Sequence, residues 1–233
     1  MSEFRTIDVA RVEGRLAPFD WAWAREERDW IDARWAKLHA ERPQMFDGRV
    51  LMAHRWAQEG DIFRADYFET RFSRFLCWRE AGRPGRVANC FAMAALRAAD
   101  GAYLLGEMGA HTANAGKIYF PAGTPDADDL VGDAVDLAGS AVRELGEETG
   151  LTPDMIEVEP RWSITQGSGM IACFRPMRLR MGAEEAVAFI HARLDAQWDR
   201  ELARIHVVRQ ADDIDAARMP PFLAAFLTRE FGG

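Results

Sequence analysis

The chain has 233 residues, of which 48% are hydrophobic and 28% charged, and its formal net charge is −8. This composition is typical of a globular protein and excludes a disordered or fibrous chain. The acidic balance disfavours nonspecific binding to nucleic acid or to an anionic membrane surface, because both need basic patches on the protein.

The chain begins with "MSEFRTIDVARVEG", which is charged from its third residue and carries no long apolar run. We therefore expect neither a signal peptide nor a membrane-spanning helix, and no membrane partner. The three cysteines, Cys77, Cys90 and Cys173, lie far apart and form no C-x-x-C pair. That usage indicates buried free thiols in a reducing compartment, so we expect a cytoplasmic protein.

Residues 20–43 predict a helix with Asp20 as its N-cap and a proline at its end. Trp23, Trp30 and Trp35 recur in it at roughly helical spacing. We interpret this aromatic stripe as a surface that packs the helix onto the rest of the protein. A stacking platform for a base, or a dimer contact, is the alternative.

Two strands, residues 48–56 and 61–68, and a short helix within residues 69–82 follow. The next stretch, "AGRPGR", holds two glycines and a proline, and we place the domain boundary there. It separates an N-terminal extension, residues 1–82, from the main domain, residues 83–233. The extension is rich in aromatic residues and the boundary is too short for a flexible linker, so we expect the extension to pack on the main domain.

The main domain mixes strands and helices without a regular βαβ repeat, which predicts an α+β fold with a mixed sheet. A strand pair joined by an Asp100–Gly101 turn comes first, and an aspartate-rich loop covers residues 124–133. The other predicted strands are residues 116–120, 161–166, 170–181 and 203–209, and the predicted helices are residues 136–148, 183–202 and 220–231.

Residues 143–151, "RELGEETGL", concentrate charge on the first of these helices. Glu144, Glu147 and Glu148 stand at i, i+3 and i+4 and therefore share one helix face. Two unit charges about 5 Å apart repel by roughly 3 kcal/mol at an effective dielectric constant of about 20, and Arg143 supplies only one positive charge. A hard divalent cation would supply two and prefers oxygen ligands. A solvated acidic face is the alternative.

The segment "FPAGTPD", residues 120–126, followed by "RELGEETGL" resembles the signature box of the Nudix hydrolases, G-x5-E-x7-R-E-U-x-E-E-x-G-U, where U is a bulky apolar residue. The second half matches at every fixed position: Arg143, Glu144, Leu145, Glu147, Glu148, Gly150 and Leu151. In the first half, Val135 stands at the box glutamate and Asp129 at the box glycine. We therefore take Gly123 as a displaced box glycine, with a longer loop after it, and expect Asp136 to replace a structural role of the missing glutamate.

This resemblance spans roughly residues 87–210 and implies an α/β/α sandwich, here with an N-terminal α/β extension. It implies Mg²⁺- or Mn²⁺-dependent hydrolysis of a phosphoanhydride bond in a nucleoside diphosphate linked to another moiety. By position, Glu144, Glu147 and Glu148 would ligate the metal, and Arg143 would orient a glutamate. The general base stays open among four carboxylates: Glu144, Glu157, Glu159 and Glu185.

The linked moiety also stays open between a nucleotide sugar, a coenzyme A derivative and similar groups. Residues 104–129 loosely resemble Nudix enzymes that act on coenzyme A, but Gly106, Glu107 and Met108 stand where those enzymes carry an arginine. Residues 42–56 and 65–72 resemble, more weakly, part of the N-terminal extension of Nudix enzymes that act on nucleotide sugars.

Four residues are candidate substrate contacts: His111, Asn114, Lys117 and Gly123. The expected partner is a small nucleotide diphosphate conjugate and not nucleic acid, and a homodimer is compatible with the sequence. The rival function is a catalytically silent Nudix-fold sensor that binds a nucleotide. The intact glutamates argue against it, since a pure binder gains nothing from three carboxylates that repel one another.

Overall fold

The computed structural model describes residues 4–112, 114–196 and 200–232, and two β-sheets organise it. The larger sheet has the strand order β1-β11-β12-β5-β6-β13, with β10 beside β12 and β7 beside β6. Its strands are β1 (Arg5–Val9), β5 (Asn89–Arg97), β6 (Tyr103–Met108), β7 (Ile118–Tyr119), β10 (Ile156–Val158), β11 (Trp162–Gly167), β12 (Met170–Leu179) and β13 (Leu202–Val208). Strands β12 and β5 run parallel and their neighbours pair antiparallel, so the sheet is mixed, as predicted.

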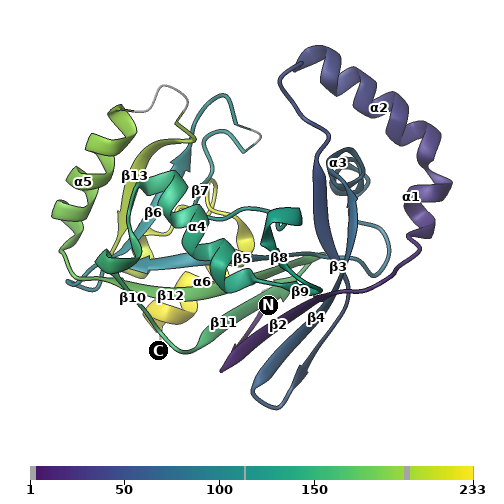
Figure 1. Ribbon diagram of the computed structural model, residues 1–233. Coiled ribbons are helices and arrows are strands. Elements are labelled where there is room, and N and C mark those ends of the chain that lie inside the picture. Colours follow the sequence, from purple (N-terminus) through teal and green to yellow (C-terminus); the bar gives the residue numbers. More distant parts are fainter. Residues whose placement is uncertain (1–3, 113, 197–199, 233) are drawn as a thin grey trace.

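Helices cover both faces of this sheet (Figure 1). Helices α4 (Leu137–Thr149) and α5 (Ala183–Asp195) pack on one face, and α6 (Pro221–Gly232) packs on the other. Alternate residues of β5 enter the two cores: Cys90, Ala92 and Ala94 face α4, whereas Phe91 and Met93 face α6. This period of two is what a strand buried on both faces produces, and the α/β/α sandwich is confirmed.

The second sheet has the order β3-β4-β2-β9-β8 and is built mostly from the part of the chain before β5, residues 4–88, which we call the leading segment. Its strands are β2 (Arg11–Leu16), β3 (Arg49–Glu59), β4 (Ile62–Arg71), β8 (Leu130–Val131) and β9 (Ala134–Val135). A bridge between Ala53 and Ala88 connects it to the larger sheet, and β1 pairs directly with β11. The leading segment therefore contributes strands to both sheets.

Three helices accompany the second sheet: α1 (Ala22–Glu26), α2 (Arg28–Glu41) and α3 (Phe72–Glu80). Figure 1 shows α3 end-on between α2 and β3, and α1 and α2 on the side away from α5. Trp21 and Trp78 are buried in the core that these helices form, while Trp30 stays partly exposed. Packing therefore accounts for most of the aromatic content of this region.

The structure corrects several predicted elements. The helix predicted for residues 20–43 is interrupted at Glu27, and Trp21 takes the N-cap position of its first part without a side-chain cap. Asp20, predicted as the cap, forms an ion pair with Arg25 instead. The helix predicted for residues 183–202 ends at Asp195, and Leu202, predicted as its last residue, belongs to β13 instead. Residues 197–199 of the predicted helix lie outside the described part of the chain.

Strands β1, β2, β8, β9 and β10 were not predicted. Charged residues interrupt the apolar alternation of β1 and β2, and the other three have only two or three residues each. All three cysteines are buried and free, as predicted. No helix among the described residues is long and apolar enough to cross a membrane.

Candidate active site

The acidic helix α4 is defined by its own sequence at both ends. The Asp136 carboxylate accepts a hydrogen bond from the Gly139 amide at 2.9 Å and caps the helix N-terminus. Gly150 ends the helix with a φ of 72°, a left-handed conformation that glycine adopts without strain. The apolar side, with Leu137, Ala141 and Leu145, packs into the core.

Arg143 connects α4 to the loop before it. Its guanidinium lies 3.0 Å from an Asp129 carboxylate oxygen, 3.1 Å from Glu144 and 3.3 Å from Glu147. The Asp129 side chain is only 3% exposed and also accepts a hydrogen bond from the Asp126 amide at 3.1 Å. The residue at the expected box glycine is thus a buried carboxylate that holds Arg143, and sequence reasoning missed this role. Asp129 lies fourteen residues before Arg143, and no local sequence pattern indicates that the two side chains meet.

Glu148 is the most buried glutamate of the helix. It is 7% exposed, and its Oε1 accepts a hydrogen bond from the Ala122 amide at 3.2 Å. The other oxygen, Oε2, is buried and has no hydrogen-bond partner among the described residues. Burial, together with the charges of Glu144, Glu201 and Glu147, raises the pKa of Glu148 to about 8 against the opposing effect of the Ala122 hydrogen bond.

Glu144 lies one turn earlier and packs against Gly123. A Cβ atom at Gly123 would come within 2.3 Å of Glu144 Oε1, so the close approach depends on glycine there. Burial raises the pKa of Glu144 to about 7, partly opposed by the positive charge of Arg143. This contact places Gly123, which we took as the displaced box glycine, directly against α4.

Glu147 differs from its two neighbours, because its side chain is 60% exposed and is oriented toward Arg143. The three glutamates therefore do not form one solvated face: Glu148 is buried and Glu144 is largely buried against residues 122–123, whereas Glu147 is exposed. Of the four carboxylates considered as general base, only Glu144 lies at this site. Glu159 pairs with Arg178 at 3.1 Å.

The charges that act most strongly on Glu144 come from Arg143, Glu147, Glu201 and Asp129, and those on Glu148 come from Glu144, Glu201 and Glu147. Glu157 and Glu185 are exposed on β10 and α5. Glu201, just before β13, was missed by sequence reasoning, because it belonged to a predicted helix.

A hard divalent cation fits part of this arrangement. Two buried carboxylates with raised pKa values, one with an unpartnered buried oxygen, are a donor set for Mg²⁺ or Mn²⁺. Within the described residues, however, no three histidine, cysteine, aspartate or glutamate side chains are already arranged around a common metal position. Glu147 would have to leave Arg143 to become a third ligand.

A cavity of about 630 Å³ opens beside these glutamates, a volume that accommodates a ligand of nucleotide size. Ala122 and Gly123 line it and also contact Glu148 and Glu144. The other residues lining it include Asn114, Lys117 and Tyr119, several aromatic and methionine side chains, and Arg79 and Arg83 from the leading segment. Of the candidate substrate contacts, Asn114, Lys117 and Gly123 therefore meet at one cavity, whereas His111 is not among its lining residues.

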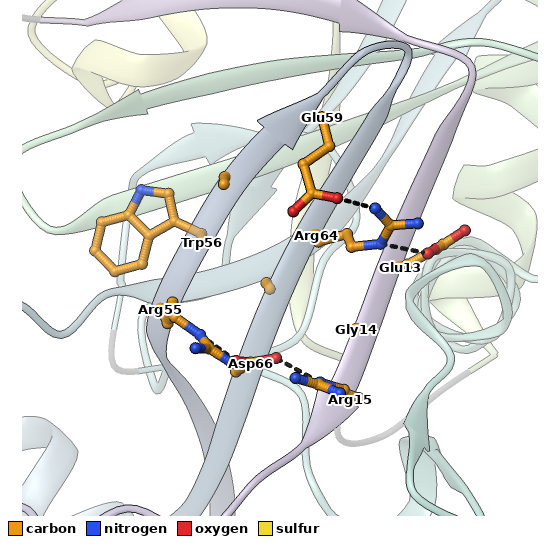
Figure 2. Close-up of a pocket in the computed structure, with 10 residues that line it drawn as sticks. Glu13, Gly14, Arg15, Arg55, Trp56, Glu59, Arg64 and Asp66 are labelled. Carbon is orange, nitrogen blue, oxygen red and sulfur yellow. Dashed lines mark hydrogen bonds and ion pairs between the residues drawn. The ribbon is translucent and has the colours of Figure 1, made fainter.

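A second depression lies on the outer face of the sheet formed by β2, β3 and β4 (Figure 2). Asp66 sits there between Arg15 and Arg55, and Arg64 sits between Glu13 and Glu59. These opposite charges pair with one another across the three strands, which gives this surface a structural explanation.

No protein-family model and no curated protein matches this chain. Among solved structures, a Nudix hydrolase from M. smegmatis, RenU, is similar to it, with 18% identity, coverage of 61% of this chain and 84% of that one, and a TM-score of 0.41. The MutT protein from Methanosarcina mazei Go1 is similar with 20% identity, coverage of 59% and 88%, and a TM-score of 0.38.

Proposed function

We propose that this chain is a Nudix-type pyrophosphohydrolase that uses Mg²⁺ or Mn²⁺ to cleave a phosphoanhydride bond in a nucleoside diphosphate conjugate. One observation carries the proposal: α4 buries Glu144 and Glu148 against residues 122–123 beside a cavity, with too little positive charge to neutralise them. A buried, unpaired carboxylate destabilises the fold, so its presence supports a function that needs it.

In this proposal Glu144 and Glu148 would hold the metal, and Glu147 would join them only by giving up its ion pair with Arg143. A bound divalent cation would neutralise phosphate oxygens and acidify a water molecule. Arg143 keeps Glu144 oriented through its contacts with Asp129 and Glu144. The Ala122 amide fixes one oxygen of Glu148 and leaves the other for a cation.

A panel of nucleotide sugars, coenzyme A and dinucleotides, each incubated with Mg²⁺ or Mn²⁺, tests this proposal. We expect metal-dependent release of a nucleoside monophosphate or phosphorylated fragment from at least one compound, and none in EDTA. Hydrolysis in ¹⁸O-water should place the label on a fragment of the cleaved anhydride. Label found only in orthophosphate released from a monoester would contradict the proposal, and tight binding without turnover across the panel would favour the sensor.

A further inference from the structure

One wall of the cavity beside the glutamates is formed by residues that precede β5 in the chain. Phe75 and Arg79 of α3 and Arg83 of the following loop come from the leading segment, while Asn89 and Phe91 face them from β5. The leading segment is therefore part of the cavity and not only a neighbour of the sandwich.

This wall carries positive charge without an anion. Within the described residues, no carboxylate forms an ion pair with Arg79, Arg83 or Lys117, which all line the cavity. The nearest sequence neighbour, Glu80, is bound by Arg34 of α2 at 2.6 Å. The guanidinium of Arg79 lies 5.6 Å from the centre of the Phe75 ring, and burial together with the charge of Arg83 lowers its pKa.

Arg83 is held in place by an unusual backbone. Its φ is 61°, a left-handed conformation that costs a non-glycine residue about 1 kcal/mol or more. Its side chain donates a hydrogen bond to the Ser168 carbonyl at 3.0 Å and packs on Gly169, where a Cβ would lie 3.0 Å from Arg83 Cδ. The Nε atom of Arg83 is buried, and no residue that the structure describes accepts a hydrogen bond from it. Such strain is retained where the side chain position matters.

Asn89 adds an unpartnered acceptor. The residue is 6% exposed and lines the cavity, and its buried Oδ1 has no hydrogen-bond partner in the described part of the chain. A buried acceptor without a partner is unfavourable unless a ligand donates to it. Apolar groups surround the same space: Phe75, Phe91, Met93, Met219 and Phe222.

Tyr119 joins this wall to the glutamates. It lines the cavity, and its hydroxyl accepts a hydrogen bond from Asn114 at 3.1 Å. Burial raises the pKa of Tyr119 to about 12, and it experiences the charges of both Glu148 and Arg79. A molecule bound at the arginines would therefore lie beside the carboxylates of α4.

We infer that the leading segment completes the substrate site: Arg79 and Arg83 bind phosphate oxygens of the substrate, and Asn89 with the apolar wall holds the nucleoside attached to them. Arg79 and Arg83 are thus specificity-determining residues contributed from outside the catalytic box. The inference rests on the proposed function for the reaction and adds the residues that select the substrate.

The test is binding of ADP and of inorganic pyrophosphate, measured by titration calorimetry in EDTA, so that no turnover takes place. Arg79→Ala and Arg83→Gly should each weaken binding of both probes about tenfold or more, because each removes charge-assisted hydrogen bonds. Glycine suits the left-handed φ of Arg83, so this variant keeps the loop conformation. Asn89→Ser should weaken ADP and leave pyrophosphate unchanged.

Arg74→Ala is the matched control. Arg74 is exposed on the same helix, is not among the residues that line this cavity, and its loss changes the net charge equally. Equal weakening by Arg74→Ala would show a nonspecific charge effect and overturn the inference. So would wild-type affinity in both arginine variants, or the absence of saturable binding of either probe to the wild type.

This binding test can succeed or fail independently of the proposed reaction, because binding in EDTA does not depend on hydrolysis. Arginine-dependent binding without hydrolysis of any panel compound would overturn the proposed reaction and leave this site in place. Hydrolysis of a panel compound with unchanged turnover and KM in both arginine variants would overturn this site and leave the proposed reaction in place.

Discussion

Asp66 and Glu148 are both buried carboxylates, yet their surroundings shift their pKa values in opposite directions. Asp66, whose side chain is 9% exposed, accepts hydrogen bonds from Arg15 at 2.7 Å and from Arg55, and the pair with Arg15 is the main reason that its pKa is lowered. Glu148 has one backbone hydrogen bond and other carboxylates around it, so burial raises its pKa to about 8. Local positive charge, and not burial alone, therefore decides whether the pKa of a buried carboxylate is lowered or raised.

The substitution Glu148→Gln should have the largest effect. Glutamine keeps the shape and one oxygen but removes the charge that a hard cation needs, so turnover should fall about 10²-fold or more. Thermal stability without metal should be unchanged or higher, since a buried charge disappears. Steady-state kinetics and thermal melts of the same preparation measure both. Glu41→Gln, an exposed glutamate of α2, is the control. Near-normal turnover of the Glu148 variant would mean that the carboxylate does not hold the metal.

Divalent metal should stabilise the wild type and not the Glu148→Gln variant. A cation that binds only the folded protein at about 100 times its Kd adds about 2.7 kcal/mol to the free energy of unfolding. The measurement is the melting temperature in EDTA against that in excess Mg²⁺ or Mn²⁺. An equal shift in both proteins would place the metal elsewhere and remove the contrast between the two carboxylates.

Asp66→Asn should act on stability and leave turnover per folded molecule intact. The variant loses two charge-assisted hydrogen bonds, but Arg15 and Arg55 are largely exposed and regain water, so we expect a loss of about 1–2 kcal/mol. Chemical denaturation gives the free energy of unfolding. A loss of turnover at unchanged stability would contradict the structural role of this ion-pair group.

The two carboxylates should also impose opposite pH dependence on the metal-free protein. Folding raises the pKa of Glu148, so its contribution to stability is fully present below about pH 4.3 and is lost as the pH rises through about 8. Folding lowers the pKa of Asp66, so its contribution is present above about pH 3.9 and is lost as the pH falls. Unfolding measured in EDTA from pH 3 to 9 should show a smaller alkaline-side loss in Glu148→Gln and a smaller acid-side loss in Asp66→Asn. Identical pH profiles for both variants and the wild type would contradict the contrast.

Much of the sandwich could be predicted because its elements are strongly patterned. Residues of β5 and β12 form long apolar runs, and α4 carries an apolar stripe, an N-cap aspartate and a C-terminal glycine. Strands β1 and β2 could not be predicted, because their partners lie far along the chain: Ile7 pairs with Ile164, and Gly14 pairs with Val135. Sequence-local patterns contain no information on such partners when the strands are half exposed and charged.

The formation of α4 and the shared face of Glu144 and Glu148 can be predicted from the sequence, because helical periodicity depends only on spacing. Which carboxylates lose water cannot be predicted in this way, since it depends on Ala122, Gly123 and Asp129, which approach α4 from another part of the chain. The packing of the whole chain also places Arg79 and Arg83 at the cavity that Ala122 and Gly123 line. Spacing sets the direction in which a side chain points, whereas desolvation and neutralisation are set by what packs against it.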